Sequence, residues 1–204
     1  MAKASYHHGD LPRAVMAAAL EDLEAGDRFA VNFHQIARRL GVSHGAIYRH
    51  FPSKQHLVDA LARSGFEQLT AAFQDALAPL ADASARERIA ALPRVYVRFA
   101  LAAPALTRLM FSGAAADRHR DPALKQAAFE AISVLQAEVT RAAADGLLPP
   151  EDVLDATRFL WASIHGLAAL RIEGQLDGML ASDAEFDRLL ARSTAWLAHA
   201  VFTP

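Results

Sequence analysis

Residues 41–54 read GVSHGAIYRHFPSK, and this stretch decides how the first third of the chain folds. Ser43 is a helix-capping residue type, and Pro52 prevents a helix over 44–50 from continuing. Gly41 marks the end of a preceding short helix, because glycine is the usual residue just past a helix end. Two short helices joined by a tight turn with a glycine are typical of a helix-turn-helix, whose second helix enters the major groove of DNA.

The sequence outside this stretch also predicts helices. Apolar residues recur at helical spacing, and most helix starts carry a capping residue, as in the pairs Asn32 with Gln35 and Ser84 with Glu87. The chain is therefore expected to be all-α, with about nine helices. These cover residues 11–25, 33–40, 44–50, 54–77, 85–101, 105–111, 122–144, 150–173 and 183 to the C-terminus.

Charge is distributed unevenly along the chain. Residues 1–66 carry eight Lys or Arg against six Asp or Glu, whereas residues 67–204 carry thirteen against seventeen. The net charge of −2 argues against a nucleic-acid partner, but no acid lies between Asp27 and Asp59. A phosphate-binding module explains this local excess of positive charge, and a solvated helical surface without acids is the alternative. The cations of this interval are Arg28, Arg38, Arg39, Arg49 and Lys54.

Several residues of the second short helix cannot belong to the core when Ala46, Ile47 and Phe51 face inward. They are Ser43, His44, Gly45, Tyr48, Arg49 and His50. All except Gly45 offer a hydrogen-bonding group, and glycine permits a close backbone approach. Lys54 lies in the first turn of the next helix, where a cation is unfavourable by about 0.3–1 kcal/mol unless an anion lies opposite. A DNA phosphate would supply that anion, and simple solvation of the lysine is the alternative.

Other classes of protein lack support in the sequence. The chain has no cysteine, so disulfides, thiolate zinc sites and cysteine nucleophiles are excluded. The nine histidines show no metal-ligand spacing, and no phosphate-loop, dinucleotide or paired-carboxylate motif occurs, so we expect no metal, no cofactor and no enzymatic activity. The longest uncharged apolar stretch, residues 99–106, is too short for a bilayer, and no leader is evident. A cytoplasmic protein without membrane contact is expected.

The stretch 41–54 resembles the DNA-binding domain of the TetR family of transcriptional regulators. Its first glycine, the Tyr-x-His-Phe tetrad at 48–51 and Lys54 lie where that family has them. The early YHHGD at residues 6–10 and the late Trp-x-x-x-His-Gly at 161–166 resemble the subgroup with a WHG-type C-terminal domain. The resemblance therefore covers nearly the whole chain.

The resemblance implies a helix-turn-helix DNA-binding domain over residues 1–56 that continues into a helical ligand-binding and dimerisation domain over residues 57–204. It implies a homodimeric repressor that a small hydrophobic effector of unknown identity releases from a roughly palindromic operator on double-stranded DNA. Backbone phosphates would be contacted by Asn32, His34, Tyr48 and Lys54, and base edges would be met or approached by His44, Gly45, Arg49 and His50.

The middle and last helices carry the candidate pocket and the candidate dimer interface. The aromatic candidates for an apolar ligand pocket are Phe73, Phe99, Phe111, Phe129, Trp161 and His165, with ordinary core packing as the alternative. A homodimer is expected through the last two helices, whose small residues allow close approach: Ala156, Ala162 and Ala168 on one, and Ala191, Ala195 and Ala198 on the other. The main alternative function is a helical ligand-binding or interaction protein without DNA binding.

Overall fold

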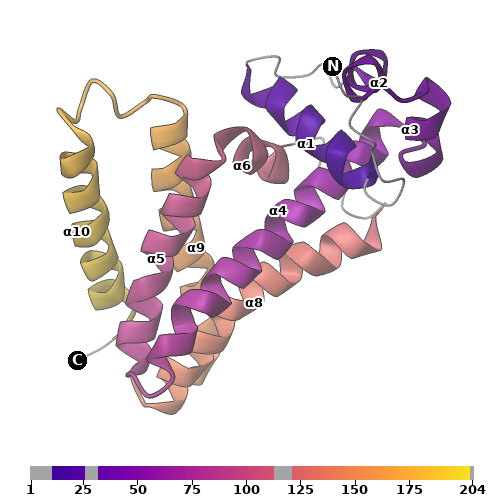
Figure 1. Cartoon of the computed structure of the whole chain (residues 1–204). Coiled ribbons are helices and arrows are strands. Elements are labelled where there is room, and N and C mark those ends of the chain that lie inside the picture. Colours follow the sequence, from indigo (N-terminus) through magenta and orange to yellow (C-terminus); the bar gives the residue numbers. More distant parts are fainter. Residues whose placement is uncertain (1–10, 26–31, 113–120, 203–204) are drawn as a thin grey trace. The chain divides into compact units, whose positions relative to one another are not determined.

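The structure of the chain is a computed structural model that describes residues 11–25, 32–112 and 121–202. Within these ranges the regular elements are nine α-helices and two short 3-10 helices, without a strand (Figure 1). The all-α expectation is confirmed. The helices are α1 (Leu11–Glu24), α2 (Phe33–Leu40), α3 (His44–His50), α4 (Lys54–Leu77), η1 (Ala78–Leu80), α5 (Ala85–Ala102), α6 (Pro104–Phe111), α8 (Pro122–Ala144), η2 (Pro150–Asp152), α9 (Val153–Ile172) and α10 (Asp183–Val201).

Local capping groups set the ends of the two short helices. The Asn32 side-chain oxygen accepts hydrogen bonds from the backbone N–H groups of His34 at 3.0 Å and Gln35 at 3.3 Å, so it begins α2. Gly41 ends that helix in the left-handed region at φ 67°, which costs glycine little. The Ser43 hydroxyl accepts from the N–H of Ala46 at 3.2 Å and begins α3. The turn predicted from the sequence is confirmed.

The chain packs as two compact units. The first combines Met1–Gly65 with Ala105–Lys125, and the second combines Phe66–Pro104 with Gln126–Pro204. Helices α4 and α8 contribute turns to both units. The expected functional boundary after residue 56 stays a prediction, because a functional domain and a packing unit need not end at the same residue.

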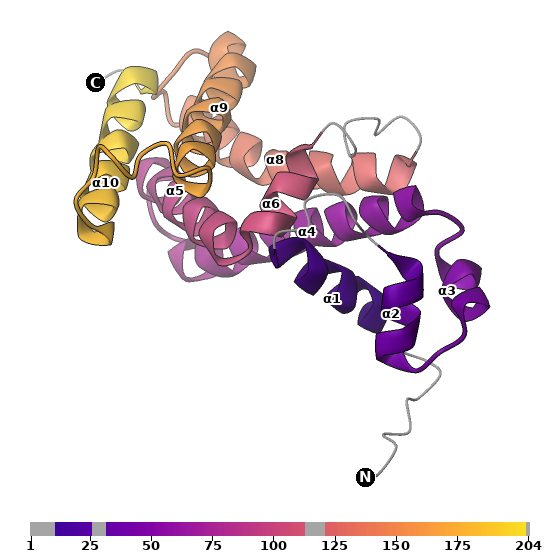
Figure 2. The ribbon, with the colours of Figure 1, turned by 90° about the horizontal axis from the view of Figure 1, so that it is seen from above.

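The first unit has a core contributed by its first four helices. Val15, Ile36, Ile47 and Leu57 come one each from α1, α2, α3 and α4, and each is fully shielded from solvent. Figure 2 shows α1, α2 and α3 grouped together, in agreement with their mutual contacts. These buried side chains fix the position of α3, while its remaining face stays outside the core.

Helix α6 belongs to the first unit and packs closely on α4 at a glycine. A Cβ atom added at Gly65 would lie 2.5 Å from the sulfur of Met110, closer than such atoms approach in proteins. Both residues are buried. The missing side chain therefore lets α6 approach the backbone of α4.

The second unit is built around α5, which packs against both α9 and α10 (Figure 1). Helix α5 is also joined to α8 by a two-pronged ion pair. The Arg88 guanidinium donates to both carboxylate oxygens of Glu138 at 2.6 Å each, and it donates to the carbonyl of Leu80 at 2.7 Å. Side chains of both charged partners are largely buried, so removal of either one leaves a poorly solvated charge.

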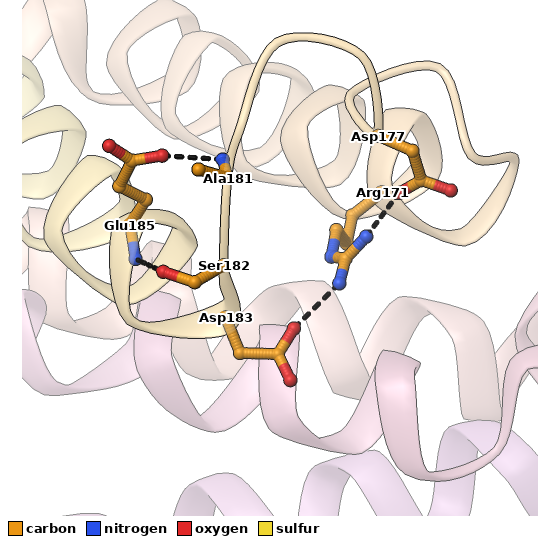
Figure 3. A network of polar contacts seen from close by, with 6 residues as sticks. All are labelled: Arg171, Asp177, Ala181, Ser182, Asp183 and Glu185. Atoms are coloured by element: carbon orange, nitrogen blue, oxygen red, sulfur yellow. Dashed lines mark hydrogen bonds and ion pairs between the residues drawn. The ribbon is translucent and has the colours of Figure 1, made fainter.

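A network of polar contacts holds the connection between α9 and α10 (Figure 3). Arg171, near the end of α9, pairs with Asp177 in the loop and with Asp183 at the start of α10, the latter at 2.7 Å. The Ser182 hydroxyl accepts from the Glu185 N–H at 3.3 Å and caps α10. The loop therefore fixes where α10 begins relative to α9.

The structure corrects part of the expected dimer interface. Ala156 and Ala168 are buried within their own subunit, because they lie on the inward face of α9 together with Leu160 and Ile164. They are not available to a second subunit, so the expectation was wrong for these two residues. Of the remaining alanines, Ala162, Ala191 and Ala195 are exposed and Ala198 is half-buried.

Candidate nucleic-acid interface and ligand cavity

Helix α3 separates its inward and outward residues as the sequence predicts. Ala46 and Ile47 are buried, and Phe51, directly after the helix, is buried as well. The outward residues Ser43, Gly45, Tyr48, Arg49 and His50 are exposed, and His44 is half-buried. A helix of this length presents a polar face about 10 Å long, which fits the width of a major groove of about 12 Å.

An aromatic cluster joins α2 to α3, and sequence reasoning missed it. The imidazole rings of His34 and His44 stack with centroids 3.7 Å apart and planes 10° from parallel. Tyr48 meets His44 edge-on at 4.7 Å and also meets Phe33 edge-on at 5.1 Å. In the sequence, each histidine lies in the first turn of its own predicted helix, and this was the only signal for the contact. The contact itself was not predicted, because the two stacked rings come from different helices.

The positively charged surface is smaller than the sequence indicates. The Arg39 guanidinium donates to the carboxylate of Asp22 at 2.7 Å and to the carbonyl of Ala18, so it ties α2 to α1. Arg38, Arg49 and Lys54 are exposed, and among the described residues none of them has an ion-pair partner. Arg28 lies outside the described residues. Three cations are therefore available to an anionic ligand on this surface.

Asn32 and Lys54 lie at the starts of the helices on either side of α3. The Asn32 carboxamide oxygen is used in capping α2, which leaves its amide nitrogen as the donor for a DNA phosphate. Lys54 is exposed in the first turn of α4, where the positive end of the helix dipole already attracts anions. Both positions are compatible with backbone contacts and carry no base specificity.

The second unit contains a small apolar cavity of about 30 Å³. Helices α4, α5, α8 and α9 all contribute to its wall. The lining residues are Phe73, Ile89, Leu92, Pro93, Tyr96, Leu135, Leu160, Trp161 and Ile164. Their side chains are almost entirely hydrocarbon or aromatic, so the cavity favours an uncharged apolar molecule.

The aromatic candidates from the sequence divide into two groups. Phe73 and Trp161 line the cavity, and His165 adjoins it through Tyr96. The remaining three do not line it. Phe129 is 59% exposed, because it lies away from the inward face of α8 that carries Leu135. Phe99 lies on α5 one turn beyond Tyr96, and Phe111 belongs to the first unit.

A hydrogen-bonded pair of neutral side chains lies beside the cavity. The Tyr96 hydroxyl and Nδ1 of His165 are 2.6 Å apart, and the Trp161 ring lies parallel to the His165 ring at 6.4 Å. Burial raises the pKa of Tyr96 and lowers the pKa of His165, because the protein interior disfavours both charged forms. Neither group therefore supplies a charge to a ligand near neutral pH. Sequence analysis missed Tyr96, whose only signal was its place on the apolar face of α5.

A larger groove of about 630 Å³ in the second unit is a poorer candidate for an effector site. It is open, it runs past the paired Arg88 and Glu138, and its other lining side chains are mostly small or polar. The two charges already satisfy each other, so they offer little to a ligand.

Other site classes find no support in the described parts of the chain. No group of three or more His, Cys, Asp or Glu there is arranged to hold a metal ion. Among the same residues no single helix is long and apolar enough to cross a membrane, and only the bent pair α5 with α6 reaches that length and composition together.

Comparison with known families agrees with the geometry of α2 and α3. The family model for bacterial regulatory proteins of the tetR family matches residues 15–61, and the model for the tetracyclin repressor-like C-terminal domain matches residues 89–193. The second match alone covers half of the chain. This chain belongs to the TetR family of DNA-binding transcriptional regulators, with a ligand-binding C-terminal domain. The finer WHG-type assignment is not confirmed by these matches.

Individual proteins resemble this chain in sequence or in fold. The nucleoid occlusion factor SlmA of Aliivibrio fischeri is 31% identical over 101 residues, which are 47% of this chain and 48% of that protein. The chain thus matches about half the length of this relative. A Rhodococcus sp. RHA1 protein of unknown function is 35% identical, with a TM-score of 0.80 over 98% of this chain and 99% of that one. FadR from Bacillus subtilis, solved with stearoyl-CoA, shares the fold at 14% identity, with a TM-score of 0.73 over 93% of this chain and 98% of that one.

Proposed function

We propose that this regulator is a repressor that binds a roughly palindromic operator as a homodimer and leaves it when a small hydrophobic effector enters the cavity of the second unit. The observation that carries the DNA part is the outward face of α3. Arg49 on that face and Lys54 beyond it are exposed cations without an ion-pair partner among the described residues. Members of this family are regulators and not enzymes, which agrees with the absence of any catalytic motif in the sequence.

In this proposal the contacts divide into positioning and reading. Phosphate contacts set the register of the protein on the duplex, and base-edge contacts in the major groove select the sequence. The phosphate group comprises Asn32, His34, Ser43, Tyr48 and Lys54, and the base-edge group comprises His44, Gly45, Arg49 and His50.

The effector is expected to be uncharged. A charged group would lose its hydration in the cavity without a counter-ion, since Tyr96 and His165 are both neutral near pH 7. The cavity of about 30 Å³ is well below the roughly 150 Å³ of an engineered apolar cavity that binds benzene. Binding must therefore displace side chains such as Phe73 or Trp161, which provides the difference between free and bound states that allosteric release requires.

The dimer is proposed to form through the outward faces of α9 and α10. Phe159 and Leu170 on α9 and Trp196 on α10 are each about half exposed, and Ala191 and Ala195 between them permit close approach. Monomeric proteins rarely leave a large contiguous apolar patch in water. A two-fold interface would combine α9 and α10 of one subunit with α9 and α10 of the other. The two recognition helices of such a dimer could then reach DNA half-sites about 34–36 Å apart. The protein would act in the cytoplasm, where its DNA lies.

Three experiments test this proposal. Selection from a pool of randomised duplexes should enrich a palindrome with half-sites about one helical turn apart, and a panel of neutral aromatic compounds should contain one that releases the enriched duplex in a gel shift. Light scattering should give a dimer at micromolar concentration, and Leu170→Glu should give a monomer. Enrichment of no sequence would refute the DNA part, and a wild-type monomer would refute the dimer.

A further inference from the structure

The stacked histidines of the first unit place the side chain of His44 before DNA arrives. His34, on α2, covers one face of the His44 ring at 3.7 Å, and Tyr48 meets the ring edge-on at 4.7 Å. Tyr48 is itself supported by Phe33 at 5.1 Å. An exposed histidine at a helix start would normally sample several rotamers, whereas this ring is held between two others.

The two nitrogens of His44 have different surroundings. Nε2 is shielded from solvent and has no hydrogen-bond partner among the described residues. In this conformation it is out of reach of a base, which leaves Nδ1 as the nitrogen that can meet DNA. A buried N–H without an acceptor is rarer in proteins than a buried acceptor without a donor. This favours the tautomer with the proton on Nδ1, so the ring offers a donor to the major groove.

We propose that His34 is a positioning residue for base recognition by His44. Its stacked ring holds the His44 imidazole so that Nδ1–H donates to N7 of a purine, the major-groove acceptor that adenine and guanine share. The inference rests on the proposed DNA-binding function. It replaces the phosphate contact that the family resemblance implies for His34 and that the grouping under the proposed function gives it.

The two roles of His34 predict different consequences of mutation. A lost phosphate contact weakens binding to all duplexes and lowers the salt dependence. A lost stacking partner leaves binding to unrelated duplexes nearly unchanged and relaxes the preference at one position of each half-site. His34→Phe separates the two, because phenylalanine keeps a flat ring for stacking and removes both nitrogens.

The experiment compares duplexes enriched from a randomised pool by the wild-type chain, His34→Ala, His34→Phe and His44→Ala. Wild type and His34→Phe should prefer a purine at the same position, and His34→Ala and His44→Ala should lose this preference with about a tenfold loss of affinity for the wild-type duplex. A 7-deazapurine at that position should weaken wild-type binding and leave binding by His44→Ala unchanged. Circular dichroism checks that each variant is folded, and binding to an unrelated duplex measures the sequence-independent part of the affinity.

Three outcomes overturn the inference. In the first, His34→Ala retains the purine preference. In the second, His34→Ala weakens binding to all duplexes alike and His34→Phe does not restore it, which makes His34 a phosphate contact. In the third, the 7-deazapurine has no effect on the wild-type chain. These results leave the proposed function standing, whereas failure of the wild-type chain to enrich any sequence refutes the proposed function and the inference with it.

Discussion

The DNA-facing surface and the cavity are assembled in different ways. Most of the DNA-facing candidates lie in one continuous stretch, residues 43–54. The position of this stretch is set by local features of the chain, namely two helix caps, a glycine turn and a proline. The cavity wall instead takes residues from four helices between Phe73 and Ile164. Local sequence therefore places most residues of the first site along the chain, while tertiary packing brings together the residues of the second. Substitutions should affect the two functions separately, and the predictions below test that separation.

The largest effect is expected from Ile47→Ala in the core of the first unit. Ile47 lies on the inward face of α3 and is fully buried. The loss of its side chain should lower the free energy of unfolding by about 2–5 kcal/mol and weaken operator binding. Chemical denaturation measures the first effect and a gel shift the second. Ile132→Ala is the matched control, because it removes the same atoms from a half-buried position on α8. Equal losses in the two variants would contradict the packing described for α3.

Trp161→Ala should impair the response to effector and spare the free protein's binding to DNA. Trp161 lines the cavity, and loss of its ring should weaken effector affinity by about tenfold, or ~1.4 kcal/mol. Operator affinity without effector should stay within about twofold of wild type, because coupling acts only when the effector is bound. Titration of effector into a protein–operator complex measures both quantities.

The control for Trp161 is Phe129→Ala, which removes an exposed aromatic ring that does not line the cavity. Its effector response should equal that of wild type. A loss of operator binding by Trp161→Ala in the absence of effector would mean that the ring only supports the fold.

Lys54→Ala should weaken binding to every duplex alike. Lys54 is exposed at the start of α4, and one lost phosphate contact lowers the slope of log affinity against log salt by about one per subunit. Anisotropy titrations on the selected operator and on an unrelated duplex, at several salt concentrations, give the slope. Lys125→Ala removes the same charge from an exposed position near the start of α8 and should leave the slope unchanged. An unchanged slope for Lys54→Ala would show that the proposed docking is wrong.

The sequence predicted features that depend on neighbours along the chain. The cap at Asn32, the helix end at Gly41 and the reciprocal cap of Ser84 with Glu87 were all found where expected, because each forms within one turn of backbone. The buried positions Ala46 and Ile47 followed from helical periodicity in the same way.

The features that sequence analysis missed join residues that are far apart in the chain. Arg39 was assigned to the cationic face, but it reaches back to Asp22. The stack of His34 on His44 and the hydrogen bond of Tyr96 to His165 depend on which helix faces which, and periodicity within one helix does not encode that. The same reason explains why Phe129 entered the list of pocket candidates although it faces solvent.

The smallest effect is expected in the pH dependence of stability, and it belongs to the second unit. Burial lowers the pKa of His165 below the 6.5 of an exposed histidine. At pH values between the folded-state pKa and 6.5, the unfolded chain therefore binds more protons than the folded chain. Stability should therefore be greatest above about pH 6.5, decrease on acidification, and stop decreasing from this cause once the pH is below the folded-state pKa. The ring is only half-buried, so solvent screening keeps the change small.

His165→Gln isolates that contribution, because glutamine offers Tyr96 a hydrogen-bonding amide and does not titrate. The loss of stability between pH 7.5 and pH 5, measured by chemical denaturation at each pH, should be smaller in this variant than in the wild-type chain. His199→Gln removes an exposed histidine from α10 and should leave the wild-type dependence intact. If His165→Gln and His199→Gln show the same acid dependence as wild type, the neutral Tyr96–His165 pair does not control the acid response of this unit. The argument for an uncharged effector would then rest on the apolar lining of the cavity alone.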